Sequence, residues 1–201
     1  MDEETMAKNL VATTRFYRSS YLDANKIITE AVHIARAVTA CKARVAIAGD
    51  AALALHGSPH LAEDVLVLAD RPVDLPSNTR CRLVVRRDNW KNLCAAAIAR
   101  ATPISGLGPP AIAAAIPLVT PPFLAALLMQ GARSMDRFGL EWMFGAPSVL
   151  DVAEARVVVR EHLGGFGLEM FERERERCEW RRRREAERTE EERDGGQNEA
   201  T

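Results

Sequence analysis

Acidic and imidazole side chains gather in one short and mostly apolar part of the chain, residues 45–70. This stretch holds Asp50, His56, His60 and Asp64. A carboxyl or imidazole group can give or take a proton, and a carboxyl group in an apolar cleft has its pKa raised by loss of hydration, which suits a general acid. Asp64, Asp50 and His60 are therefore the candidate catalytic residues.

Each of these side chains also has an ordinary structural explanation. Asp is a good cap for the amino end of a short helix, which would account for Asp50. An acid at a strand edge can cap a turn, which would account for Asp64. His56 and His60 could lie at the surface or have their hydrogen bonds satisfied. The sequence alone leaves both explanations open.

The spacing of apolar residues predicts the elements that position these side chains. In chain order they are a helix at 25–43, a strand at 44–48, a short helix at 50–56, strands at 64–69 and 80–85, and helices at 88–101, 121–132, 135–144 and 148–163. This order predicts an α+β (α/β) fold, with a small mixed sheet flanked by helices and a helical C-terminal half.

Composition divides the chain into an N-terminal arm at 1–22, a domain at 23–170 and a charged segment at 171–201. Within the domain, the strands occupy about 44–104 and the helical part about 117–170. Residues 172–194 hold ten acids and nine arginines.

A sequence of this kind favours a solvent-exposed helix that frays into a disordered tail. The charged helix is also a candidate surface for a protein partner, anchored by Trp180, or for oligomerisation. RNA binding by the arginines at 181–184 is disfavoured by the acids around them.

The overall composition excludes several function classes. The 201 residues carry 27 basic and 28 acidic side chains, a net charge of −1, so no field over the whole molecule attracts nucleic acid. The four cysteines lack the spacing of a zinc site or a disulfide framework, which favours a reduced, cytoplasmic protein. No signal peptide is evident, and prolines interrupt the uncharged run at 101–130, so no membrane span is expected.

The pattern over 45–70 resembles the nucleotidyltransferase superfamily, with its DNA polymerase beta-like fold, and especially the minimal, abortive-infection-toxin-like branch. It consists of an apolar strand, a turn at Gly49, a short helix, a bend at His56 and Gly57, and an acid, Asp64, that opens a second strand. In that family, amides at the glycine turn cradle a triphosphate, and paired carboxylates on the strand hold divalent metal.

A second segment extends this resemblance through the C-terminal half, to about residues 26–170. Residues 116–144 look like the family's proline-led helix with a Lys and a closing Arg, followed by a Lys-Asp-x-x-Asp helix. Arg133 matches the closing arginine, whereas His60 replaces an arginine of the earlier bend. The resemblance thus rests on pattern more than on identity.

The residues that the family uses for catalysis are mostly replaced in this chain. Asp64 matches the first metal carboxylate, but Leu66 stands where the second is expected. Asp50 occupies the place of a Gly or Ser beside the phosphate. Leu128 and Gly139 stand where a Lys and the second Asp of the last motif are expected. A single carboxylate is a poor magnesium site, so the resemblance with these replacements implies neither a metal nor a cofactor.

Three functions stay open on this basis. The first is a degenerate nucleotidyltransferase-fold protein that binds a small apolar molecule or a protein partner. The second is a repurposed, metal-independent isomerase, cyclase or hydrolase that acts on an apolar molecule in the old cleft. The third is an active nucleotidyltransferase or toxin–antitoxin component. The residues expected to line the ligand site are Gly49, His56, Leu66, Leu128 and Arg133.

Overall fold

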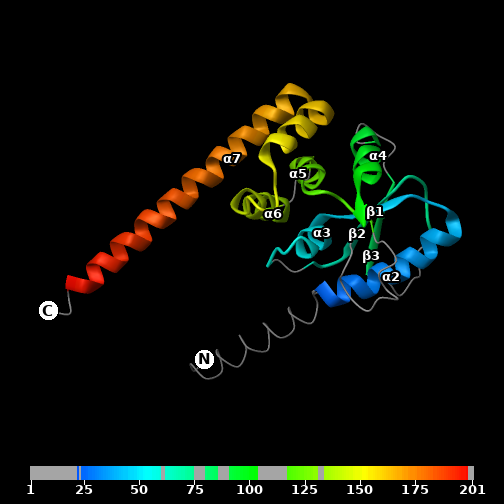
Figure 1. The fold of residues 1–201 in the computed structure, drawn as a ribbon, viewed down its shortest axis with the longest axis horizontal. Helices are drawn as coiled ribbons and strands as arrows, with labels where there is room; N and C mark the ends of the chain where they lie inside the picture. The colour runs from blue at the N-terminus through cyan, green and yellow to red at the C-terminus, as the bar shows by residue number, and fades with distance from the viewer. Residues whose placement is uncertain are drawn as a thin grey trace, which may run out of the picture.

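The computed structural model describes residues 22, 24–59, 62–74, 80–85, 91–103, 117–130 and 134–198. This part of the chain forms six helices and five strands (Figure 1). They are α2 (Ala24–Cys41), β1 (Val45–Ala48), α3 (Gly49–Leu55), β2 (Val65–Ala69), β3 (Cys81–Val84), α4 (Lys91–Arg100), β4 (Thr102–Pro103), β5 (Pro117–Leu118), α5 (Pro121–Gln130), α6 (Ser134–Gly145) and α7 (Val152–Asn198). The mixed α/β class predicted from the sequence is confirmed.

The five strands form one open mixed sheet in the order β3-β2-β1-β5-β4. β1 pairs antiparallel with β2 and parallel with β5, while β2 pairs parallel with β3. All four residues of β1 are buried, which requires cover on both faces of the sheet. Figure 1 shows helices on either side of it, with α5, α6 and α7 gathered on the side away from α2.

Apolar periodicity locates most of these elements correctly, but the sequence analysis missed β4 and β5. Each of these strands has only two residues, and they pair antiparallel with each other through Thr102 and Leu118. A run of two residues is too short to carry an alternating pattern. The sequence predicts a helical C-terminal half, and α5, α6 and α7 confirm it.

The short helix α3 begins one residue before the predicted position. The chain turns at Gly49, which has a φ of 62°, a value that favours glycine because it has no Cβ. Ala48 is therefore the N-cap residue and makes no side-chain cap hydrogen bond. Asp50 lies in the first turn, so the interpretation of Asp50 as the cap is wrong, although an acid is still favoured there by the helix dipole.

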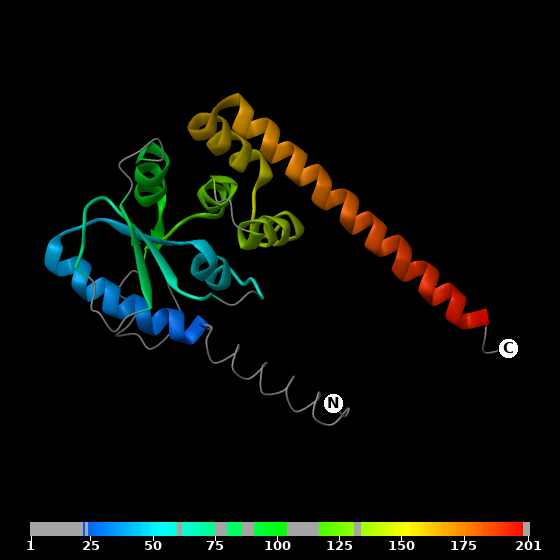
Figure 2. The ribbon, with the colours of Figure 1, turned by 180° about the vertical axis from the view of Figure 1, so that it is seen from behind.

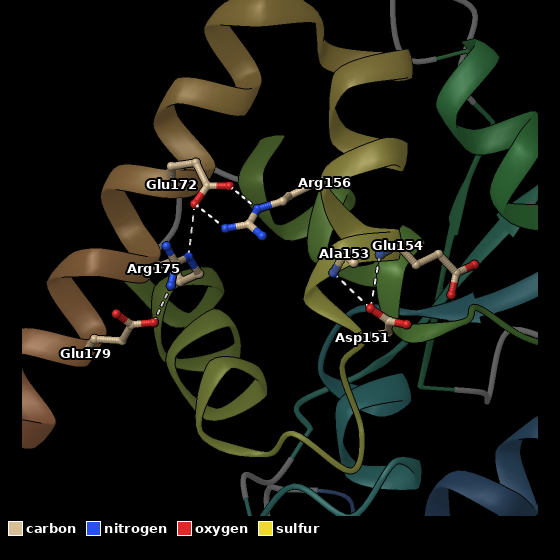
Figure 3. Close-up of polar contacts among 7 residues, drawn as sticks. All are labelled: Asp151, Ala153, Glu154, Arg156, Glu172, Arg175 and Glu179. Carbon is tan, nitrogen blue, oxygen red and sulfur yellow. Dashed lines mark hydrogen bonds and ion pairs between the residues drawn. The ribbon is translucent and has the colours of Figure 1, made fainter.

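The last helix, α7, is a helical hairpin. Gly164 breaks it with φ 72° and ψ −172°, and the chain reverses there. The first arm begins at Val152 and not at the predicted residue 148. Asp151 sets this start, because its Oδ1 accepts hydrogen bonds from the backbone amides of Ala153 at 2.8 Å and Glu154 at 3.2 Å (Figure 3).

The second arm of α7 packs against α6. Phe171 and Cys178 are fully buried. The Phe171 ring contacts the Phe144 ring edge-on, with 5.1 Å between the two ring centroids. Further along, the Arg181 guanidinium pairs with the Glu141 carboxylate at 2.6 Å. Burial thus continues past residue 170, where composition places the end of the domain.

Truncation after Glu185 is expected to leave cooperative unfolding intact. Every described side chain from Arg182 to Glu190 is exposed, so the deletion removes no described buried side chain. Thermal unfolding followed by circular dichroism would test this. Truncation after Met170 is the matched control, because it removes Phe171 and Cys178 and should abolish the transition. Loss of the transition in the shorter deletion would contradict the expectation.

None of the helices that the structure describes is both long enough and apolar enough to cross a bilayer. The predicted arm at 1–22 lies outside the described residues except for Leu22. That residue is buried, and its backbone bridges to Ala62.

Candidate functional site

Asp64 lies directly before β2, and its carboxylate forms an ion pair with the Arg82 guanidinium. Its Oδ2 lies 3.1 Å from Nε of Arg82, and the two side chains are 38% and 45% exposed. Arg82 reaches it because β3 runs parallel to β2, with Arg82 opposite Leu66. The sequence analysis missed Arg82, since only strand pairing brings this residue beside the acid. Asp64 is thus paired with a cation and partly exposed to solvent.

Two residues expected to line a ligand site, Gly49 and Leu66, lie in contact. A Cβ added at Gly49 would be 3.2 Å from Cδ2 of Leu66. Gly49 also needs its positive φ, so a side chain is disfavoured there on two grounds. The turn that would hold a phosphate in the resembling family is therefore packed against an apolar side chain.

The helices α3, α5 and α6 meet at a second apolar contact, which involves Leu53, Leu128 and Gly139. Leu53 is 1% exposed and Leu128 is 4% exposed. A Cβ added at Gly139 would lie 2.6 Å from Cδ1 of Leu53 and 3.3 Å from Cδ1 of Leu128. Leu53 is a member of this contact that no motif indicated. Its only sequence signal is its place in the apolar run of the short helix.

The imidazole of His56 joins the end of α3 to the start of the helical half. Its Nε2 lies 2.9 Å from the carbonyl oxygen of Val119, between β5 and α5. Burial lowers the pKa of His56, and the hydrogen bond to Val119 opposes part of that shift. A neutral imidazole with Nε2 protonated donates this bond. The geometry agrees with the interpretation of His56 as a satisfied histidine.

The remaining predicted site residues are only partly placed. Asp50 is half-buried in the first turn of α3. His60 and Arg133 lie outside the described residues. Across the ranges that the structure describes, no group of three or more His, Cys, Asp or Glu side chains could hold a metal ion.

A charged cluster links the two arms of α7 (Figure 3). It includes none of the predicted site residues. The Glu172 carboxylate accepts hydrogen bonds from Nη2 of Arg156 and from Nε of Arg175, each at 3.0 Å. Arg175 also pairs with Glu179. Hydrogen bonding to Arg156 is the largest cause that lowers the pKa of Glu172 to about 2, and Arg175 adds to it. The pair between Arg156 and Glu172 is the link of this cluster between the two arms of α7.

A surface hollow of about 320 Å³ lies on the second arm of α7 and includes none of the predicted site residues. It is lined by Arg181, Arg184, Glu185, Glu187 and Arg188.

Comparison of the chain with protein-family models, with curated proteins and with solved structures finds no match in any of the three.

Proposed function

We propose that this chain is a degenerate nucleotidyltransferase-fold protein that has lost metal-dependent nucleotidyl transfer and acts in the cytoplasm as a binding module. The contact among Leu53, Leu128 and Gly139 is the observation that carries the proposal. At two of these positions the resemblance calls for a Lys and an Asp. A charged group placed there would lose its hydration at a cost of several kcal/mol.

The contact at Gly49 supports the same conclusion from the other half of the motif. Leu66 occupies the position of the second metal carboxylate and packs against the turn. Asp64, the remaining acid, is held by Arg82. Apolar contacts and an ion pair therefore replace the groups that would bind phosphate and metal in the resembling family.

Among binding partners, a protein is favoured over a small apolar molecule. The buried contact at Leu128 fills space that an apolar ligand would have to open. In contrast, α7 exposes Phe166 at 77% and Met170 at 38%. These two side chains are four residues apart, which places them side by side on one face of a helix. Neighbouring exposed apolar side chains are typical of protein-binding surfaces.

Purified protein is expected to show no magnesium-dependent ATP binding at physiological nucleotide concentrations. Asp64 alone of the expected carboxylate pair is present, and one carboxylate is a weak magnesium site. Isothermal titration calorimetry with MgATP, and with ATP plus a chelator, measures this directly. Tight binding that requires magnesium would overturn the proposal in favour of an active nucleotidyltransferase.

A metal-independent enzyme remains the second candidate, because the Asp64 carboxylate is exposed enough for a substrate to reach. Asp64→Asn keeps the shape of the side chain but cannot deliver a proton. If Asp64 only forms a surface ion pair, the substitution should cost at most about 1 kcal/mol of unfolding free energy, measured by urea denaturation. Arg82→Gln is the matched control, since it breaks the same pair from the other side.

The same variant separates the two functions once a substrate is found. A general acid at Asp64 would make Asp64→Asn slower by about two to four decades, with little change in stability. Turnover within a few-fold of the unmodified protein would remove Asp64 from any mechanism.

A further inference from the structure

The second arm of α7 extends well beyond the rest of the fold. Arg181 pairs with Glu141 of α6, and every described side chain from Arg182 to Glu190 is exposed. The backbone nevertheless remains helical as far as Asn198. In Figures 1 and 2 the C-terminal end of α7 stands clear of the other helices and strands. At 1.5 Å per residue this projection is about 25 Å long.

A projecting helix of this length has little to stabilise it by itself. Isolated helices shorter than about 12 to 15 residues are marginal in water, and helices in proteins gain most of their stability from packing against other elements. The pair between Arg184 and Glu187, at 3.6 Å, contributes only a small amount, and Arg184 also faces Arg188 one turn later. A second helix that packed along the projection would supply what the segment lacks.

One side of the second arm contacts the first arm, where Glu172 pairs with Arg156. In steps of three and four residues this side continues through Arg175 and Glu179, which pair with each other within the second arm. The same stepping reaches Arg182, Ala186 and Glu190, past the point where the first arm begins. The side of the helix that contacts the first arm thus runs on along the projection.

The charges on this continued face are complementary to themselves. Arg182 lies four residues before Ala186, and Glu190 lies four residues after it. If a second copy lies antiparallel with Ala186 at the two-fold axis, Arg182 faces Glu190 of that copy, and Glu190 faces its Arg182. A parallel arrangement would place each charge opposite its own kind, which is unfavourable.

We propose that residues 182–190 of α7 form an antiparallel helix pair with the same segment of a second copy of this chain. The small side chain of Ala186 lets the two helices approach at the axis. The symmetric arrangement forms the ion pair between Arg182 and Glu190 twice, as an isologous interface requires.

Sedimentation velocity of the full chain over a range of protein concentrations and at low and high salt tests this pairing. A reversible dimer is expected, with a dissociation constant that rises with salt because exposed charges are screened. Arg182→Glu alone and Glu190→Arg alone each oppose like charges at two symmetric places. Each should weaken the dimer at least tenfold. The double variant Arg182→Glu/Glu190→Arg restores the pairing and should return the dissociation constant to within about threefold.

The control is Arg184→Glu, which makes the same charge change on the other side of the helix and should leave the dimer unchanged. Circular dichroism checks that every variant is folded. A monomer at all concentrations and salts would overturn the proposal, as would a dimer that neither single variant weakens. Failure of the double variant to recover the dimer would overturn the antiparallel register.

Discussion

Gly139→Asp is expected to lower the free energy of unfolding by about 3 to 5 kcal/mol. The substitution restores the acid that the nucleotidyltransferase resemblance calls for at this position. Its Cβ would lie 2.6 Å from Cδ1 of Leu53, and its carboxylate would enter an apolar contact also made by Leu128. Because Leu53 and Leu128 are buried, the charge would have neither water nor a described cation beside it. Urea denaturation measures the loss.

Gly139→Ala separates the effect of the charge from the effect of added volume. The atom that its Cβ meets is the far end of the flexible Leu53 side chain, which can move. Alanine also favours the helix over glycine by about 1 kcal/mol. The alanine variant should therefore stay within about 1 kcal/mol of the unmodified protein. If the aspartate variant were equally stable, the contact would be open to water, and the proposed loss of the old cleft would lose its main support.

Phe171→Ala is expected to cost about 3 to 5 kcal/mol of unfolding free energy. Phe171 is fully buried, and its ring contacts the Phe144 ring edge-on. The alanine variant loses both the buried apolar surface and this ring contact. The substitution tests whether the second arm of α7 belongs to the folded domain. Urea denaturation of the variant and of the unmodified protein under the same conditions gives the difference in unfolding free energy.

Trp180→Ala is the matched control for Phe171, as a large aromatic side chain on the same arm of α7. Trp180 is 57% exposed, and its ring faces the Arg184 guanidinium at 5.8 Å. Its removal should cost less than about 1 kcal/mol. Equally small effects at both positions would place the end of the cooperative domain before residue 171.

The sequence predicts the elements whose apolar residues repeat over several turns or alternations. The helix α2 and the strands β1 and β2 follow directly from such patterns. The pair β4 and β5 does not, because two residues define no period and the segment between them has no clear pattern. A dense charge run also conceals Phe171 and Cys178, which are seven residues apart and share one buried side of α7.

The candidate site is predicted less completely, because its contacts join distant parts of the chain. Motif spacing identifies Asp64, Leu66 and Leu128 as positions of interest. It does not indicate that Arg82 forms an ion pair with Asp64, since this depends on the pairing of β2 with β3. Nor does it indicate that Leu53 fills the space beside Gly139, which depends on how α3 meets α6. Residue types are visible in a sequence, whereas their neighbours are set by tertiary packing.

The parallel pairing of β1 with β5 has a consequence for the order in which the nascent chain can fold. Ile47 pairs with Leu118, and the imidazole of His56 meets the Val119 carbonyl, so both contacts wait until residues 117–119 have left the ribosome. Until then β1 can pair with β2 on one side only, and its other edge stays open. An open apolar strand edge is a template for aggregation. The period of synthesis between β2 and β5 is therefore the one in which this edge of β1 is open to wrong pairing.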